Sequence, residues 1–160
     1  MILFLSFVMS LPLLLRDAPK PGTVTAVHDG NTLSMTANDG EKYRVVLMGI
    51  DCPELEQPYG REAKQLLEGL VLSREIVFEV HGKDRLGNHV GIVLIEDGED
   101  VRLQLLAEGL AWTAERDPIG DLEAIRLGAM RERKGLWEQD DPVAPWLFRR
   151  QQSMMEPKSR

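Results

Sequence analysis

The groups best suited to chemistry in this chain of 160 residues are two carboxylates, Asp51 and Glu54, which stand three positions apart. Carboxylate oxygens bind hard cations, and a carboxylate can take a proton from an attacking water. A cysteine and a proline lie between them, so a strand exit followed by a proline turn explains the same residues equally well. The stretch from Asp29 to Asn31 is a second polar cluster, and alone it is typical of a hairpin turn.

Other reactive side chains give weaker signals. The single cysteine, Cys52, excludes a disulfide within the chain and a zinc site built on cysteines. No motif pairs this cysteine with a base, so we expect an unreactive thiol. His28, His81 and His89 lack the spacing of metal ligands, and the four carboxylates within residues 96–100 are typical of a solvated hairpin tip. None of these groups predicts a further site.

The elements that must position the two carboxylates follow from hydrophobic periodicity. Alternating residues at 23–28, 31–36 and 43–48, separated by Asp-Gly turns, predict a three-stranded meander. Apolar residues at i, i+3, i+4 and i+7 predict a helix that begins near Gly60. The remaining predicted elements are strands at 75–80 and 89–95 and helices at 101–109 and about 121–134.

The last predicted helix completes the fold. We expect Leu122, Ile125, Ala129 and Met130 on its inner face, and Gly135 ends it. Five short strands with a helix between the third and the fourth are typical of a small closed barrel of the OB type. The predicted fold class is therefore α+β, mainly β, with a five-stranded OB-type barrel and three helices.

The charge of the chain limits its partners. The whole chain has 19 basic and 26 acidic residues, and residues 22–148 carry 13 Lys and Arg against 24 Asp and Glu. Affinity for a polyanion comes mostly from neutralised phosphates, so we expect at most weak binding to nucleic acid. An acidic body is compatible with cation binding.

The amino terminus is a separate segment. Residues 1–15 are almost entirely apolar, too short for a membrane span of roughly 20 residues and similar to the apolar region of a signal peptide. No Lys or Arg precedes them, and no small-x-small cleavage site follows before Arg16. We expect export or a membrane tether, and the alternative is a buried or oligomer-forming segment of a cytoplasmic protein. The predicted division is 1–21 for this segment and a linker, 22–150 for the domain and 151–160 for a flexible tail.

Several blocks of residues carry a family likeness in the correct order. They are DGNT at 29–32, VLMGIDCPE at 46–54, QPYGREAK at 57–64, DRLGN at 84–88, GLW at 135–137 and PWLFR at 145–149. With these blocks the chain resembles the staphylococcal-nuclease-like, or thermonuclease, family over roughly 22–150. The resemblance implies an OB-type barrel with three helices and hydrolysis of phosphodiesters with one calcium ion.

The resemblance also implies roles for individual residues. Asp51 and the backbone carbonyl of Cys52 match two of the family's calcium ligands, and Glu54 matches its general base. The family's first metal carboxylate falls on Asn31, whose amide oxygen can still coordinate calcium but brings no charge. The expected calcium site is therefore weak or vestigial.

The two arginines with which the family holds the phosphate fall on Val46 and Asn88. Each lost contact of this kind costs about 10²–10³ in rate. We therefore expect no guanidinium beside the carboxylates, and a degraded active site with weak or no nuclease activity. Two alternatives stay open. One is a noncatalytic module that binds nucleic acid or a protein partner; the other is an active nuclease in which Arg44, on the same strand face as Val46, or a second subunit supplies the missing charge.

Overall fold

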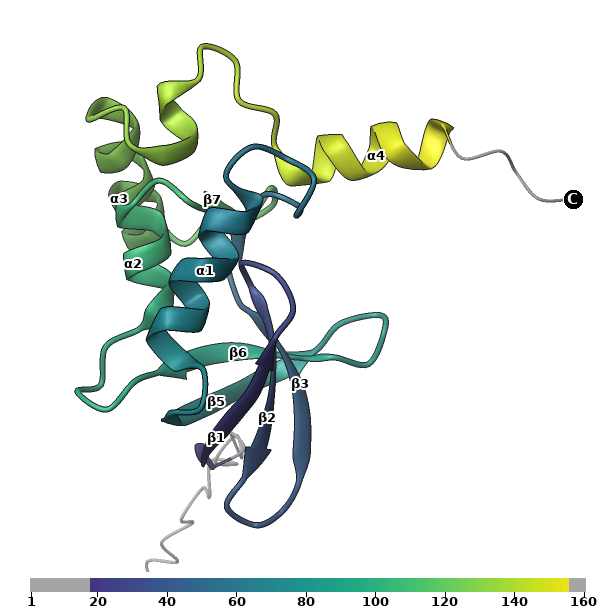
Figure 1. The fold of residues 1–160 in the computed structure, drawn as a ribbon, viewed down its shortest axis with the longest axis vertical. Helices are drawn as coiled ribbons and strands as arrows, with labels where there is room; N and C mark the ends of the chain where they lie inside the picture. Colours follow the sequence, from purple (N-terminus) through teal and green to yellow (C-terminus); the bar gives the residue numbers. More distant parts are fainter. Residues whose placement is uncertain (1–17, 156–160) are drawn as a thin grey trace, which may run out of the picture.

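The computed structural model describes residues 18–155 (Figure 1). The strands are β1 (Lys20–Val27), β2 (Thr32–Ala37), β3 (Lys42–Leu47), β4 (Ile50–Asp51), β5 (Glu75–Lys83), β6 (His89–Leu94) and β7 (Trp112–Thr113). The helices are α1 (Gly60–Val71), α2 (Val101–Ala107), α3 (Gly120–Arg131), the short 3-10 helix η1 (Gly135–Glu138) and α4 (Pro145–Met155).

Five strands form a closed barrel in the order β1-β2-β3-β6-β5. β3 and β6 run parallel, and the other neighbouring pairs are antiparallel. The OB-type barrel predicted from the element order is confirmed. β4 and β7 form a second, two-stranded sheet, which hydrophobic periodicity did not predict because two residues are too few to show a period.

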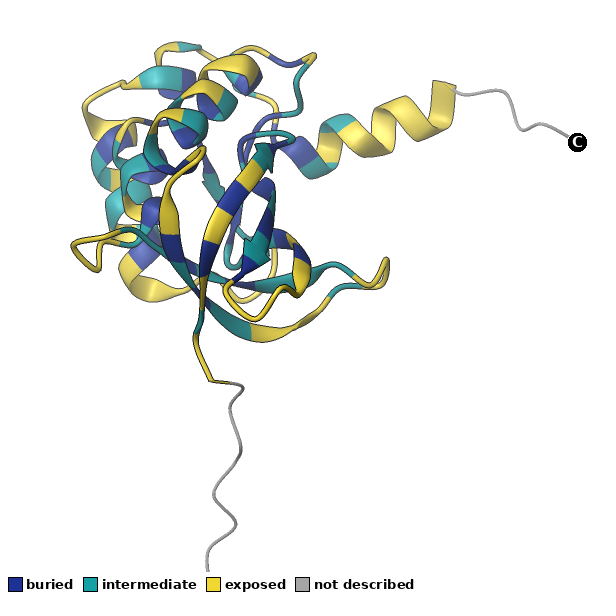
Figure 2. Cartoon of the chain, turned by 60° about the horizontal axis from the view of Figure 1, so that its bottom comes forward, coloured by how far each residue is buried: buried dark blue, intermediate teal, exposed yellow. Residues whose placement is uncertain are grey.

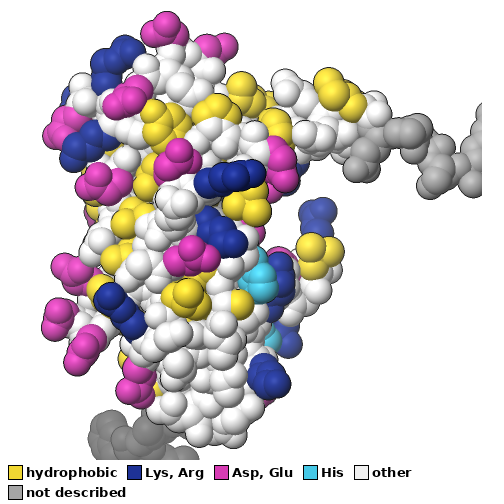
Figure 3. Space-filling model, in the orientation of Figure 1, with side chains coloured by type: hydrophobic (Ala, Val, Ile, Leu, Met, Phe, Trp, Pro, Cys, Tyr) yellow, Lys and Arg dark blue, Asp and Glu magenta, His cyan; other side chains and the backbone are white. Residues whose placement is uncertain are grey.

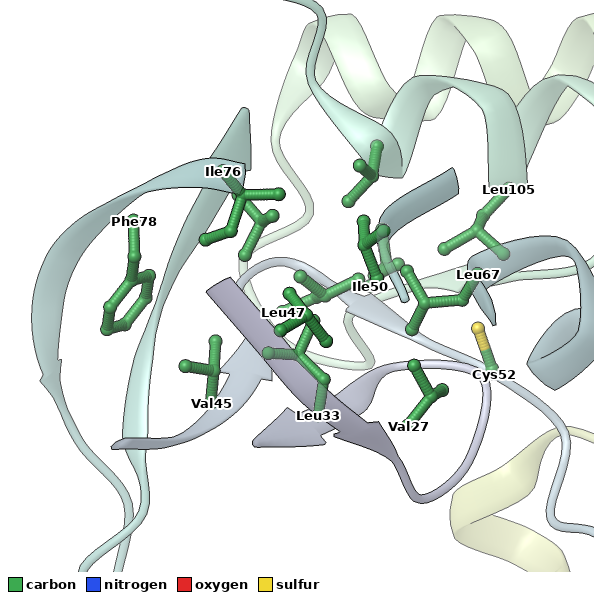
Figure 4. Packing of buried hydrophobic residues seen from close by; sticks show 14 of the residues in the cluster. Val27, Leu33, Val45, Leu47, Ile50, Cys52, Leu67, Ile76, Phe78 and Leu105 are labelled. Carbon is green, nitrogen blue, oxygen red and sulfur yellow. The ribbon is translucent and has the colours of Figure 1, made fainter. Parts of the chain in front are cut away.

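The hydrophobic core fills the barrel and continues under the helices (Figure 4). Inward side chains of the strands, such as Leu33, Val45 and Phe78, are fully buried, whereas the residues between them are more exposed (Figure 2). Each such side chain contributes about 1.5–3 kcal/mol by leaving water. Leu67 of α1 and Leu105 of α2 belong to the same cluster, so these helices are packed onto the barrel.

The described residues contain four α-helices, where three were predicted. The additional helix is α4, which runs five residues into the segment predicted to be a tail. Its first turn packs on the domain, and the rest projects away from the domain and is exposed (Figures 1 and 2). The sequence of α4 is mostly polar after Phe148, so it shows little of the periodicity on which the other helices were predicted.

Several element bounds differ from the sequence-based expectation. β5 runs on to Lys83, and α3 ends at Arg131, before η1 begins at Gly135. β1 begins at Lys20, because Lys20 and Pro21 pair with Phe78 and Val77 of β5. Met130 is half exposed, at 49%, and does not lie inside, because one residue turns the helix by 100° away from the buried Ala129.

A buried arginine fixes the approach to β4. Arg102 of α2 forms an ion pair with Asp100 at 2.6 Å, and its Nη1 donates a hydrogen bond to the carbonyl of Met48 at 2.7 Å. Asp100 also caps α2 by accepting a hydrogen bond from the backbone N–H of Arg102. The hydrogen bond from Arg102 to Met48 connects α2 to the residues that lead into β4.

The apolar residues 1–15 lie outside the described part of the chain, so export or tethering through them stays a prediction. Within residues 18–155, no helix combines the length and the apolar character that crossing a membrane requires.

Candidate active site

Asp51 is held by the two-stranded sheet. It ends β4 and lies opposite Trp112 of β7, next to the buried Ile50. This pairing fixes the backbone on which Asp51 stands, and its side chain remains 19% exposed. Asp51 therefore sits on a rigid support at the surface of the barrel.

Glu54 is positioned by a buried glutamine. The side-chain oxygen of Gln57 accepts a hydrogen bond from the backbone N–H of Glu54 at 2.9 Å, and the backbone N–H of Gln57 donates to the carbonyl of Glu54 at 2.9 Å. The amide nitrogen of Gln57 donates to the carbonyl of Val143 at 2.9 Å. Gln57 thus connects the loop that carries Glu54 to the segment that leads into α4.

Asn31 is brought next to Asp51 and Cys52, as the resemblance predicts. Its amide oxygen accepts a hydrogen bond from the backbone N–H of Cys52 at 3.2 Å, and its own backbone N–H donates to Asp29 at 2.9 Å. The thiol of Cys52 is buried, and burial raises its pKa well above the ordinary value, in keeping with an unreactive cysteine. Asn31 therefore joins the turn after β1 to the end of β4.

Val46 and Asn88 lie where they supply no positive charge to the carboxylates. Val46 is paired with Thr32 of β2 and with Val90 of β6. The side chain of Asn88 donates to Asp84 at 2.8 Å and so closes the turn between β5 and β6. The structure gives neither residue a contact with Asp51 or Glu54.

Arg149 of α4 places its guanidinium against both carboxylates. Nη1 donates to Oε1 of Glu54 at 2.7 Å and to Oδ1 of Asp51 at 3.2 Å, and Nη2 donates to Oδ2 of Asp51 at 2.7 Å. The expectation that no guanidinium stands beside these carboxylates is therefore wrong. The charge comes from α4, and not from Arg44, to which the structure gives no contact with either carboxylate.

The base of α4 aims Arg149 at the site. Trp146 packs edge-on against Trp112, with ring centroids 5.7 Å apart, and Trp112 is the register partner of Asp51. Trp146 and Arg149 are three residues apart and share one face of the helix. Sequence reasoning included Arg149 in the PWLFR block but assigned it no role. The three-residue spacing of an anchoring tryptophan and an arginine is the signal that could have found it.

Burial and the neighbouring Arg149 act in opposite directions on the pKa of the Asp51 carboxyl. Burial raises the pKa of its carboxyl, the hydrogen bonds from Arg149 oppose this rise, and the charges of Asp29 and Glu115 add to it. The same hydrogen bonds raise the pKa of Arg149, so the guanidinium stays charged. The next residue, Arg150, pairs with Glu115 at 2.8 Å. Two adjacent arginines of α4 therefore cover an acidic rim.

The expected calcium ligands do not fit an ion in this arrangement. Both carboxylate oxygens of Asp51 accept hydrogen bonds from Arg149, and the amide oxygen of Asn31 accepts one from Cys52. Within residues 18–155, no three His, Cys, Asp or Glu side chains form a group that could hold a metal ion. A calcium ion would need oxygen atoms that now face hydrogen-bond donors.

The fold and the site together define a nuclease-like OB barrel. The family described as staphylococcal nuclease homologue matches residues 44–139. An uncharacterized endonuclease of Escherichia coli O157:H7 is 33% identical over 146 residues, which cover 89% of this chain and 92% of the relative. The probable staphylococcal-like nuclease CAN1 of Oryza sativa subsp. japonica is 40% identical over 111 residues, which cover 69% of this chain and 33% of that protein. The chain belongs to the staphylococcal nuclease family.

Proposed function

We propose that this protein is a phosphodiesterase of the nuclease type, which acts at the site formed by Asp51, Glu54 and Arg149, called the pocket below. The observation that carries this proposal is the contact of one guanidinium with both carboxylates at 2.7 Å, in a member of the staphylococcal nuclease family. A proton acceptor and a cationic hydrogen-bond donor then face the same small volume, as hydrolysis of a phosphodiester requires. The name of the Escherichia coli relative supports cleavage within a strand.

In the proposed reaction, Glu54 accepts a proton from a water whose oxygen attacks phosphorus. The bond between phosphorus and the leaving oxygen breaks, and that oxygen takes up a proton from solvent. A guanidinium has five N–H groups, and the hydrogen bonds to the two carboxylates use three of those of Arg149. The other two can donate to the phosphate oxygens, on which negative charge accumulates.

We also propose that turnover is slow. Val46 and Asn88 stand where the resemblance implies two arginines, and the pocket gains one guanidinium from Arg149. The site therefore lacks at least one oriented cationic contact of the family pattern, and each such contact corresponds to about 10²–10³ in rate. This argument supports a weakened enzyme and gives no reason for an inert one.

The distribution of charge supports nucleic acid as the substrate, although the body is acidic. Lys, Arg and His side chains gather along the edge of the barrel below α4, whereas Asp and Glu predominate along the opposite edge (Figure 3). Lys42 and Arg44 of β3 are exposed and form no salt bridge within residues 18–155. The neighbouring His28 is hydrogen-bonded to Ser34 at 2.8 Å, and burial lowers its pKa, as do the charges of Arg44 and Lys64.

His28, Lys42 and Arg44 form a basic face on the first three strands of the barrel. In OB barrels, strands 2 and 3 are a common surface for oligonucleotides. Arg44 lies opposite Ser34 in the register of β2 and β3. We propose that the nucleic acid runs over this face into the pocket. The acidic charge of the other face limits the affinity, as the composition predicts.

The test of the proposed function is cleavage by the full chain of labelled single-stranded DNA and RNA. Glu54→Gln is expected to lower the rate by about 10²–10⁴, because the proton acceptor is lost. Glu56→Gln is the matched control, since Glu56 is an exposed carboxylate two residues away, and it should leave the rate unchanged. Absence of cleavage by the unmodified chain, or equal rates for both variants and the unmodified chain, would contradict the proposal.

A noncatalytic binding module is the second candidate. The observation that favours it is that Arg149 already neutralises part of the charge of both carboxylates, which would also suit a purely structural anchor for α4. This candidate predicts that the chain binds single-stranded nucleic acid or a protein partner without cleavage, and that Glu54→Gln binds the strand as tightly as the unmodified chain.

A further inference from the structure

We propose that Arg149 is the resident cation of this pocket, so that its guanidinium and a divalent cation compete for Asp51 and Glu54. The ion and the guanidinium cannot both occupy the space between these carboxylates. This inference rests on the proposed function for one consequence, namely that cleavage at this pocket does not depend on a divalent cation.

The contact geometry gives the first support. A divalent cation at Asp51 and Glu54 would have to face Oδ1 and Oδ2 of Asp51 and Oε1 of Glu54, and all three atoms accept hydrogen bonds from Arg149. Two of these bonds measure 2.7 Å, the short length typical of charge-assisted hydrogen bonds. An ion that enters the pocket must therefore first displace the arginine side chain.

The charge balance gives the second support. Asn31 stands where the resemblance implies a metal-binding carboxylate, so the pocket has one negative charge less than the family pattern. The carboxylates of Asp51 and Glu54 carry two negative charges and the guanidinium of Arg149 carries one positive charge, so the net charge of the three groups is one negative unit. A divalent ion among three carboxylates would leave the same net charge. The loss of a carboxylate at Asn31 and the gain of a guanidinium are thus electrostatically matched.

The position of α4 gives the third support. The apolar anchor of the helix is at its base, where Pro145 is buried and Trp146 packs on Trp112, and the residues from Arg149 onward are exposed. Arg149 lies one turn beyond this anchor and is 48% exposed, yet its guanidinium makes three hydrogen bonds to the site. The anchor holds the cation within reach of the carboxylates without burying it.

Calorimetric titration of the full chain with Ca²⁺ tests the competition without depending on nuclease activity. We expect Arg149→Gln to bind Ca²⁺ at least about tenfold more tightly than the unmodified chain, because a positive charge a few ångströms from the ion is removed. Arg150→Gln is the matched control: it removes the same charge from the next position of α4 and should change the affinity far less. Asp51→Asn, added to Arg149→Gln, should abolish the gain.

Equal Ca²⁺ affinity of the unmodified chain and Arg149→Gln would overturn the inference, and so would a gain that Arg150→Gln reproduces. Arg149→Lys provides a variant that keeps the charge and is expected to bind Ca²⁺ as weakly as the unmodified chain. Where cleavage is observed, its rate for the unmodified chain should be the same in Ca²⁺ and in a chelator. A chain that does not cleave contradicts the proposed function, while the titration still decides whether Arg149 excludes the ion.

Discussion

Gly60 offers the sharpest test of how the fold positions Glu54. An ideal Cβ at Gly60 would lie 1.9 Å from the carbonyl oxygen of Glu54, whereas ordinary contacts begin at 3.4 Å. The substitution Gly60→Ala must therefore push the Glu54 backbone and the start of α1 apart by about 1.5 Å, the difference between these two distances. Overpacking of this kind costs about 1–3 kcal/mol of unfolding free energy. A displacement of about 1 Å at a catalytic group can lower the rate about 10²-fold.

Gly69, in the same helix, is the matched control, because a Cβ there meets nothing within 4 Å. Gly69→Ala is expected to raise the unfolding free energy by about 0.5–1 kcal/mol through the higher helix propensity of alanine. Urea unfolding followed by tryptophan fluorescence gives both stabilities, and strand cleavage gives both rates. If Gly60→Ala proves as stable and as active as Gly69→Ala, the proposed coupling between the start of α1 and Glu54 is refuted.

Three further predictions concern the pH dependence, the loop of Glu54 and the basic face. Hydrogen bonds from Arg126 lower the pKa of Glu123 from 4.5 to about 2, so Glu123→Gln should lose about 1–3 kcal/mol of unfolding free energy at pH 7. Because a lowered pKa stabilises the folded state above pH 4.5, this difference should shrink as the pH falls toward about 2 in urea unfolding. Gln57→Ala should cost about 1–3 kcal/mol and slow cleavage, since it removes the hydrogen-bond partner of the Glu54 backbone N–H and of the Val143 carbonyl, and thermal unfolding with a cleavage assay would show both. Arg44→Gln should weaken binding of single-stranded DNA and reduce its salt dependence by about one unit in fluorescence anisotropy, whereas Arg131→Gln on α3 should not.

The fold could be predicted from the sequence because its elements carry local signals. Asp-Gly turns separate the first three strands, and the apolar face from Ala63 to Leu70 identifies α1. The OB-type barrel followed from the order of these elements. β4 and β7 were missed because each has two residues, and a period cannot be read from two positions.

The candidate site could be predicted only in part. Asp51, Asn31 and Cys52 lie together, as the resemblance implies, because the turn after β1 is bonded to the end of β4. Arg149 could not be found in this way, because the chain returns to Asp51 only after 98 residues. The contact depends on the anchoring of α4 by Trp146. The spacing of Trp146 and Arg149 indicates that they share one helix face, but not where that face packs. The charge count covered residues 22–148 and therefore did not include Arg149, whose guanidinium contacts Asp51 and Glu54.

A double-mutant cycle between Glu54 and Arg149 tests most directly whether these residues form one catalytic unit. Cleavage rates in a chelator would be measured for the unmodified chain, Glu54→Gln, Arg149→Gln and the double variant. If the two side chains act together, the double variant should lose little more activity than the worse single variant. Losses that multiply, or an unmodified chain whose cleavage none of the variants slows, would contradict the placement of hydrolysis at this pocket.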